Sequence, residues 1–321
     1  MPSIAPSIFR TDPRLAASYS QQASLAAEYL ISTNLTANVS YLLVRRSKLA
    51  RTRNVNLLSP LLLTSQNSEA LGIPNPTPQQ VNRPVFGPDR ISSQFGNIYQ
   101  LEDSASSTYH GLTLSLNRRL ADKFEFSASY TLSKTLDDAS DFDEQPQNPF
   151  DLRAERALSR QHQQHRFVFN ALWELPIGDE EVAGKRQSSG SASLLSRAFG
   201  HVEVAPILTV AGGRPENPLT GLDWNRAQAF PVSGRPVGLG RDSLKSPGEA
   251  TLDIRVVKLL PFGSLSRRLD LVVEFFNLFK HYNATQTNPV FGMQSLPIAG
   301  FKQPSAGAGA RQIQFSIDFE F

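Results

Sequence analysis

Five acidic residues lie close together in the segment Lys134–Gln164, and carboxylates at such spacing could supply oxygen ligands to a calcium ion. They are Asp137, Asp138, Asp141, Asp143 and Glu144. The segment lacks the glycine-punctuated loop of a defined calcium site. We therefore expect a solvated acidic loop, with a calcium site as the alternative.

Two histidines, His162 and His165, follow the acidic segment and are three residues apart. On a helix this spacing would put both imidazoles on one face, where they could share a metal ion. The pair instead precedes an alternating segment that predicts a strand, and no third ligand lies at motif distance. We therefore predict no metal site, and no cofactor is implied. The remaining histidines, His110, His201 and His281, are scattered.

A charged set between the loop and the next strand could serve an enzyme. It consists of Asp151, Arg153, Glu155 and Arg156. The sequence contains no nucleophile elbow, no phosphate-binding loop and no dinucleotide-binding glycine motif. No catalytic constellation supports the set, so we predict that the protein is not an enzyme.

Composition excludes several classes of function. The chain has 321 residues and no cysteine, which excludes disulfide bonds and thiolate metal sites. Its 32 basic and 29 acidic residues give a net charge of +3, which is too balanced to indicate nucleic acid binding. No apolar run reaches the roughly 18 residues of a transmembrane helix. The mean hydropathy of −0.27 fits a soluble β-protein and a membrane β-barrel equally well, because half of a barrel wall faces water.

The elements that must position these residues are strands, and the clearest strand lies at the end of the sequence. After Arg311, polar and apolar residues alternate without exception up to Phe321. The apolar set is Ile313, Phe315, Ile317, Phe319 and Phe321. Side chains of a strand alternate between its two faces, so this strand has one apolar and one polar face. A strand between lipid and a watery lumen has this pattern.

The same alternation recurs in eight further segments. They are residues 22–30, 35–43, 109–120, 124–133, 166–175, 201–210, 251–258 and 268–279. Most are about ten residues long, the length that a tilted strand needs to cross a bilayer, whereas strands of soluble proteins are typically about five or six. We expect their apolar faces to contact lipid, above all through the aromatic residues Phe124, Phe126, Tyr130, Phe167, Phe169, Trp173 and Phe275.

Short turns and long polar connections alternate between these segments. Ser32–Asn34, Ala121–Lys123 and Pro261–Ser266 are short. The long stretches are residues 47–107, 134–164, 212–249 and 281–310. Outer-membrane barrels have short periplasmic turns and long extracellular loops, so this asymmetry favours a barrel. The link at residues 177–199 is an exception, because it is long where a short turn is expected.

The strand directions follow if the terminal strand runs toward the periplasm. Alternating directions then put the long loops outside and the tight turns Ser32–Asn34 and Ala121–Lys123 inside. This requires that Ile98–Glu102 belongs to an outer loop. The prediction is an all-β, antiparallel, up-and-down transmembrane β-barrel that is partial, with about nine or ten strands of a larger barrel. Residues 1–17 are expected to be irregular and residues 18–321 to form the partial barrel domain.

One predicted strand contains a proline. Pro206 lies in line with the apolar residues of segment 201–210. Proline has no N–H to donate to a β-ladder, so we expect this strand to be bulged, at an edge or misassigned.

Several segments, taken in order, carry a family resemblance. They are Tyr109–Leu120 (YHGLTLSLNRRL), Phe124–Asp138, Asn148–Gly178, Glu274–Asn283 and Arg311–Phe321, with Ser47–Asn56 upstream. Over roughly residues 15–321 the order and spacing of these segments resemble TonB-dependent receptors of the Oar-like type. The resemblance implies a full-length plan of signal peptide, regulatory β-sandwich, plug domain and a large barrel.

Only the last barrel portion of that plan is matched. No plug or TonB box is recognised, and the first residues lack the basic and apolar regions of an export signal. We therefore expect the C-terminal part of a receptor barrel, in the cell outer membrane, for uptake of a large or scarce solute. Alone it is not expected to be transport-competent or to form a stable pore. TonB would act only through the missing plug.

The resemblance also implies roles for single residues. Phe321, with Phe315 and Phe319 before it, resembles the signal read by the barrel-assembly machinery; a simple strand-end hydrophobe is the alternative. The charged set around Glu155 becomes a structural network between loop and strand. Lumen-facing ion pairs, rather than a substrate site, are expected from Arg166, Glu174, Asp253, Arg255, Asp270 and Glu274.

Two other functions stay open at this point: a secreted or surface β-rich binding module such as an adhesin, and a passive porin. Long strands with aromatic residues on one face favour a barrel over a soluble module. The partners expected for the receptor are outer-membrane lipid, the barrel-assembly machinery, the missing N-terminal barrel and plug segments, and an unknown solute. Siderophores, oligosaccharides and peptides all fit the sequence.

Overall fold

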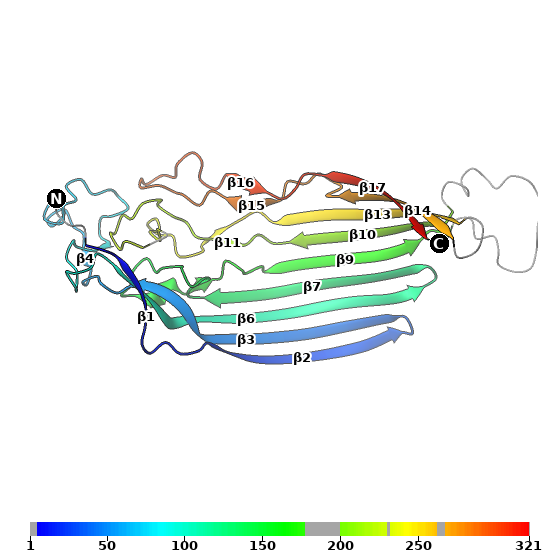
Figure 1. The fold of residues 1–321 in the computed structure, drawn as a ribbon, viewed down its shortest axis with the longest axis horizontal. Coiled ribbons are helices and arrows are strands. Elements are labelled where there is room, and N and C mark those ends of the chain that lie inside the picture. The colour runs from blue at the N-terminus through cyan, green and yellow to red at the C-terminus, as the bar shows by residue number, and fades with distance from the viewer. Residues whose placement is uncertain (1–4, 177–199, 230–231, 262–266, 321) are drawn as a thin grey trace, which may run out of the picture.

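In the computed structural model, one antiparallel sheet of nine long strands dominates the molecule (Figure 1). The described residues are 5–176, 200–229, 232–261 and 267–320. The long strands are β2 (Tyr19–Ser32), β3 (Leu35–Asn54), β6 (Ile98–Ala121), β7 (Phe124–Asp137), β9 (His165–Glu174), β10 (Val202–Ala211), β13 (Glu249–Pro261), β14 (Arg268–Phe276) and β17 (Gln312–Glu320). Neighbours in the sheet follow each other in sequence, so the topology is up-and-down, as predicted.

The remaining elements are short. β1 (Ile8–Thr11) pairs in parallel with β6, and β8 (Ala157–Leu158) pairs with β7. Three small pairs lie in the connections: β4 (Leu61–Leu62) with β5 (Pro84–Val85), β11 (Pro215–Glu216) with β12 (Leu244–Lys245), and β15 (Ala284–Thr287) with β16 (Pro304–Gly307). The single described 3-10 helix, η1, is Leu152–Glu155. Residues 1–17 were expected to be irregular, but β1 gives them a short strand.

Long and short connections lie at opposite ends of the sheet (Figure 1). The connections β3–β6, β7–β9, β10–β13 and β14–β17 leave from one end, called the loop end here. The β2–β3 and β6–β7 turns lie at the other, the turn end. Asp122 and Lys123 both have positive φ (51° and 62°), as a two-residue hairpin turn with the twist of its strands requires. The link at 177–199 and the turn at 262–266 lie outside the described residues.

β6 corrects one expectation. Ile98–Glu102, assigned to an outer loop, is the continuous loop-end part of this 24-residue strand. Tyr99 pairs with Asn54 of β3 on one side and with Phe9 of β1 on the other. Two neighbours satisfy the backbone groups of this segment, which keeps it extended beyond the length needed to cross a bilayer.

Strand register brings the predicted lipid-facing residues onto one face. Phe124 is opposite Trp173, Tyr130 is opposite Phe167, and Phe169 is opposite Leu208. The same face continues through β13, β14 and β17, where Ile254, Phe275 and Ile313 form one row. The ring of Phe126 lies 5.6 Å from that of Phe124 and 6.1 Å from that of Phe169. We call this surface the apolar face.

Pro206 lies in the interior of the sheet, not at an edge. β10 pairs with β13 along its whole length and with β9 on the other side, without a register shift. Leu175 N–H donates to Val202 O, and Gly212 N–H donates to His165 O, so even-numbered residues of β10 bond toward β9. The nitrogen of Pro206 therefore faces β9, and one ladder bond is missing there. The predicted bulge, edge or misassignment was wrong.

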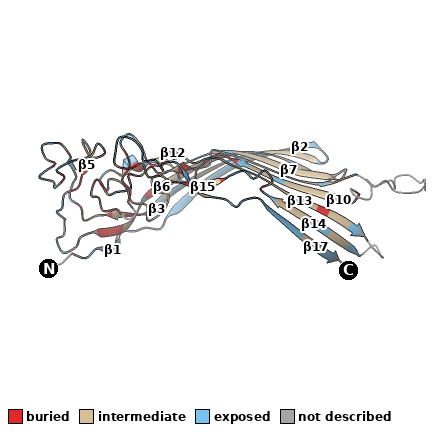
Figure 2. Cartoon of the chain, turned by 90° about the horizontal axis from the view of Figure 1, so that it is seen from above, coloured by how far each residue is buried: buried red, intermediate tan, exposed pale blue. Residues whose placement is uncertain are grey.

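Buried side chains gather toward the loop end (Figure 2). One cluster consists of Leu63, Ile73, Val85 and Trp224, and a second of Leu57, Phe86 and Ala227. Each joins the β3–β6 connection to the β10–β13 connection. The outer connections therefore form a packed body with its own core, which we call the loop body. Among the described residues, no helix has the length and apolar character to span a membrane.

Candidate functional site

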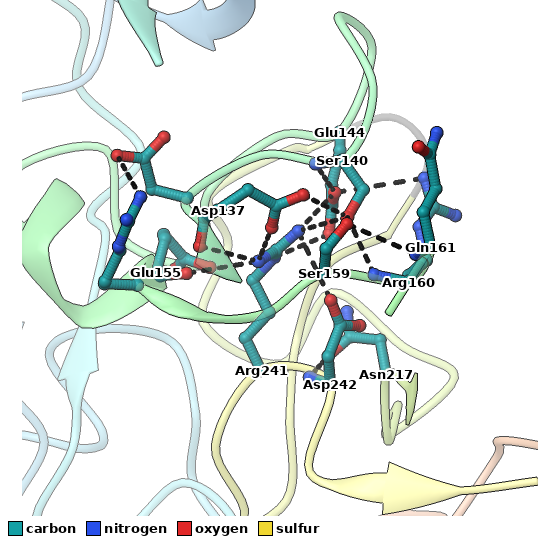
Figure 3. Close-up of polar contacts among 12 residues, drawn as sticks. Asp137, Ser140, Glu144, Glu155, Ser159, Arg160, Gln161, Asn217, Arg241 and Asp242 are labelled. Carbon is teal, nitrogen blue, oxygen red and sulfur yellow. Dashed lines mark hydrogen bonds and ion pairs between the residues drawn. The ribbon is translucent and has the colours of Figure 1, made fainter. Parts of the chain in front are cut away.

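A buried arginine holds the loop body together (Figure 3). Arg241, in the β10–β13 connection, has a side chain that is 1% exposed. Its Nη1 donates to Asp137 Oδ1 at 2.8 Å, and its Nε and Nη2 donate to the two carboxylate oxygens of Glu144 at 2.8 Å each. Burial lowers the pKa of Arg241, but hydrogen bonds and charges of Glu144, Asp242 and Asp137 outweigh it and hold the pKa above its ordinary value.

The acidic segment is therefore not a solvated loop. Asp137 and Glu144 are bound by Arg241, and Asp138 Oδ1 lies 3.2 Å from Arg51 Nη2. Arg241 is about 100 residues away from these carboxylates in the sequence, so the acidic segment alone does not predict the ion pairs. The two remaining carboxylates, Asp141 and Asp143, are exposed as expected.

Asp242 is the least satisfied carboxylate of the site. Neither of its oxygens accepts a hydrogen bond from any described residue, although Arg241 Nη2 lies 3.3 Å from Oδ2. Burial raises the pKa of Asp242 to about 7, against the pull of Arg241; the charges of Glu144 and Asp137 add to the rise. Asp242 is thus a carboxyl that changes its charge near neutral pH.

A second buried pair joins the same two connections. Arg235 Nη1 and Nη2 donate to the two carboxylate oxygens of Glu155 at 2.8 Å each. Gln147 N–H also donates to Glu155 Oε1 at 3.0 Å. Glu155 belongs to the charged set for which the family resemblance implied a structural network, and it has that role. Asp151 and Arg153 of the same set are exposed.

The β3–β6 connection joins the body through aromatic and amide groups. The guanidinium of Arg83 lies 3.8 Å from the ring centroid of Trp224. Burial, together with the nearby charge of Arg235, lowers the pKa of Arg83 to about 10. Tyr99 Oη donates to Gln228 O at 2.7 Å. Three connections that are far apart in sequence thus form one body.

A cavity of about 500 Å³ opens between the connections β7–β9, β10–β13 and β14–β17. Four of its lining side chains are carboxylates and one is a guanidinium: Asp141, Asp143, Glu144, Glu216 and Arg160. Asn217, Ser233, Gln286 and Thr287 add amide and hydroxyl groups. We call it the acidic cavity. Its chemistry suits polar or cationic solutes, because an anion would meet several negative charges.

A second cavity, of about 470 Å³, is largely apolar. Phe9, Tyr99, Leu101 and Phe142 line it, and the rings of Phe9 and Tyr99 stack at 4.9 Å. It lies where β1 crosses the loop end of β6.

A family model described as "Outer membrane beta barrel domain" matches residues 2–314, almost the whole chain. The chain belongs to this outer membrane β-barrel family. The predicted fold class and the outer-membrane localisation are thereby confirmed. No curated protein matches the sequence.

Among solved structures similar to this barrel protein, one with a TM-score above 0.5 shares its fold. The outer membrane transporter YddB from Escherichia coli is 11% identical, with a TM-score of 0.56; the match covers 99% of this chain and 35% of that one. The FrpB iron transporter from Neisseria meningitidis is 10% identical, with a TM-score of 0.49, covering 98% and 33%. The receptor FpvA of P. aeruginosa is 12% identical, with a TM-score of 0.48, covering 95% and 27%. The chain spans about a third of the length of these structures.

The two neighbouring histidines of this barrel protein have separate partners. Thr135 N–H donates to Nδ1 of the buried His162 at 3.3 Å, whereas Nδ1 of the exposed His165 lies 2.7 Å from Tyr130 Oη. Within the described ranges, no group of three or more potential ligand residues could hold a metal ion.

The barrel's polar face contains part of the predicted ion-pair set. Arg255 Nε lies 4.0 Å from Glu274 Oε1, and Asp270 Oδ2 lies 3.3 Å from Arg268 Nε. Asp253 accepts a hydrogen bond from Asn277 N–H at 2.7 Å instead. Arg166 and Glu174 lie at opposite ends of β9, so the strand does not bring them together.

The predicted assembly-signal residues end the last strand. Phe315 and Phe319 lie on the apolar face and are 75% and 53% exposed. Phe321 lies outside the described residues. Recognition by the assembly machinery stays a prediction, as does lipid contact of the aromatic residues on the apolar face.

Sequence reasoning missed the arginines that organise the site. Arg235 and Arg241 sit in a long polar connection with no recognisable motif. The one available signal is the excess of acidic residues in the segment that follows β7, which requires cations from elsewhere if it is to be buried.

Proposed function

We propose that this chain is the wall and outer-loop part of a TonB-dependent outer-membrane receptor, and that its acidic cavity binds the solute. The observation that carries the proposal is the loop body itself. Buried charged pairs fix the β10–β13 connection to the β7–β9 connection, and the β14–β17 connection completes the cavity wall. A receptor needs a preformed binding cavity at its outer end, whereas a passive pore needs only the barrel wall.

The position of the loop body supports this reading. Asp137, which anchors Arg241, lies on the same face of β7 as Thr131, Ser133 and Thr135, opposite the apolar face. The part of the loop body around Arg241 thus lies on the polar side of the sheet. A solute bound in the acidic cavity would lie on the lumen side of the sheet, from which a receptor passes its solute into the barrel.

The cavity chemistry narrows the solute class. Asp141 and Asp143 are exposed carboxylates without an ion pair among the described residues. Asp141 Oδ1 accepts a local hydrogen bond from Phe142 N–H at 2.7 Å, which leaves its charge available to a solute. With Glu216 on the opposite wall they favour a cationic or hydroxyl-rich solute over an anionic one. Energy from TonB would reach the solute through a plug domain, which is not among the strands and loops described above.

Uptake assays in the native host test the proposal. The double substitution Asp141→Asn/Asp143→Asn is introduced at the native locus, with Asp122→Asn at the turn end as the matched control. Cells receive ferric chelates, oligosaccharides or peptides at limiting concentration, with and without an uncoupler. Losing charge-assisted hydrogen bonds at about 1.5–3 kcal/mol each should weaken uptake of one solute class roughly tenfold or more.

The uncoupler separates the receptor from the porin. A receptor should lose uptake when the membrane is de-energised, and the control variant should behave as wild type. Uptake that continues in de-energised cells would identify a passive porin. If the double substitution changed the uptake of none of the tested solutes, the acidic cavity would not be the binding site.

A further inference from the structure

Two tyrosine–histidine pairs mark the loop-end border of the apolar face. Tyr41 Oη lies 2.7 Å from His110 Nδ1, and Tyr130 Oη lies 2.7 Å from His165 Nδ1. Strand register puts all four side chains on the same face as Leu112 and Leu132. Rings with one apolar and one polar end are typical of the boundary between acyl chains and headgroups.

Beyond this border the same face becomes basic. His110 is opposite Leu43 on one side and Lys134 on the other, and one step further Arg45 is opposite Thr108. Arg156, from the β7–β9 connection, reaches the same place and donates from Nη2 to Thr108 Oγ1 at 3.1 Å. Three strands and one loop therefore gather basic groups around Thr108.

These charges are largely uncompensated. Arg45 and Lys134 are exposed, and neither makes a hydrogen bond or ion pair with any described residue. Asp138 borders the cluster, but its carboxylate also pairs with Arg51, at 3.2 Å, and lies 3.9 Å from Arg156. The cluster thus presents three guanidinium or ammonium groups and one imidazole just beyond the tyrosine–histidine border.

We propose that Arg45, His110, Lys134 and Arg156 bind the phosphate groups of a phosphorylated glycolipid in the outer leaflet. Its acyl chains would pack on Leu43, Leu112 and Leu132, directly below. Guanidinium groups bind phosphate through two parallel hydrogen bonds. The cluster extends across three strands, about 10 Å at the usual strand spacing of about 4.8 Å, which fits two phosphates on one headgroup better than a single phosphodiester.

Lipid binding to the purified protein tests this site. The protein is extracted from native outer membranes in mild detergent, exchanged into lipid-free micelles and titrated with diphosphoryl lipid A. The test variant is Arg45→Gln/Lys134→Gln. The matched control is Arg46→Gln, because Arg46 is the next residue of β3 and lies on the opposite, polar face. We expect at least tenfold weaker binding for the test variant and wild-type binding for the control.

Competitors identify the source of the phosphate. Monophosphoryl lipid A should bind more weakly than the diphosphoryl form, while phosphatidylglycerol and inorganic phosphate should compete poorly. Equal binding by Arg45→Gln/Lys134→Gln and Arg46→Gln would overturn the site. Competition by phosphatidylglycerol as strong as by lipid A would overturn the glycolipid assignment. The substitution Arg45→Lys keeps the charge and should retain most of the binding, which separates charge from an effect on folding.

Discussion

At the scale of residues, the buried guanidinium of Arg241 holds together the buried Asp137 and Asp242 and the partly buried Glu144. Buried ion pairs are weak evidence for stability, because desolvation offsets much of their attraction. Removing one partner is costly, however, since the others are left as unpaired buried charges. Removing Arg241 should therefore weaken the loop body locally, around these three carboxylates.

Replacing Arg241 with methionine should open the loop body. Arg241→Met leaves the buried Asp137 and Asp242 and the partly buried Glu144 without their cation, at a cost of about 3–5 kcal/mol. Arg160→Met is the control. Arg160 is half exposed and its Nη2 lies as far as 3.9 Å from Glu144 Oε2, so this ion pair is worth about 1 kcal/mol or less. Protease cleavage of the outer connections, monitored by mass spectrometry, measures the difference. Equal cleavage of both variants would contradict the proposed role.

Asp242 should make the loop body sensitive to pH. Its folded pKa of about 7 is above its ordinary value of 3.8, so the folded state holds a proton that the unfolded state releases. This contribution to stability is therefore greatest below about pH 4 and is lost as the pH rises to about 7.

The substitution Asp242→Asn should remove that loss. Above pH 7 the variant should be more stable than wild type, and the difference should vanish below about pH 4. Hydrogen exchange of the outer connections, measured across this range, reports it. Glu144 has a lowered pKa and titrates in the opposite sense at lower pH, but both proteins share that effect. Identical pH profiles for the two proteins would show that Asp242 is not the titrating group.

At the scale of elements, alternation of residue types is enough to predict a strand and its two faces. Phe124, Phe169 and Phe275 were assigned to one face from the sequence, and the register of four strand pairs puts them there. The pattern is local, because period two requires only near neighbours along the chain. The outer end of β6 was missed for the same reason, since its strand character comes from β1 and β3 and not from its own pattern.

An arginine on the apolar face should destabilise the sheet in a membrane. Phe169→Arg places a charge among lipid tails if this face meets them, which costs about 2–4 kcal/mol near the bilayer centre. Asn170→Arg, one residue along β9 and on the polar face, should change stability little. Urea unfolding in lipid vesicles compares the two. A larger loss for Asn170→Arg would mean that the faces are reversed.

Pro206 leaves one ladder bond unmade between β10 and β9, next to lipid if the apolar face meets it. The substitution Pro206→Val restores the N–H donor in an otherwise regular strand, so we expect about 1 kcal/mol of added stability. Pro215→Ala, in the two-residue strand β11, is the control and should give little gain. The urea unfolding midpoint measures both. A loss of stability in Pro206→Val would show that the proline is needed for the local curvature.

At the scale of the whole molecule, the strands can be predicted from the sequence, whereas the contacts within the loop body cannot. Nine strands, their order and the separation of turns from loops follow from local patterns. The contact of Arg241 with Asp137 joins positions 104 residues apart, and no periodic pattern in the sequence predicts it. Its partners were assigned to solvent because an acidic segment alone is best hydrated.

Assembly into the membrane should depend on the end of β17. If Phe315, Phe319 and Phe321 form the assembly signal, Phe319→Ser should lower the amount of protein in the outer membrane several-fold. Asp318→Ser, on the opposite face, should not. Heat-modifiable migration in cells, compared with spontaneous folding into vesicles, separates recognition from stability. Equal losses in both settings would indicate a strand-end hydrophobe with no signalling role.

The directions of the two outermost strands have one more consequence. β2 and β17 each pair on one side only among the described strands, and antiparallel order over nine strands makes both run from the loop end to the turn end. If they met directly, they would form a parallel pair, whereas all neighbouring pairs among the nine long strands are antiparallel. The same holds for β17 of one copy beside β2 of another in the same membrane orientation. A closed wall that is antiparallel throughout must therefore place an odd number of additional strands between these two edges.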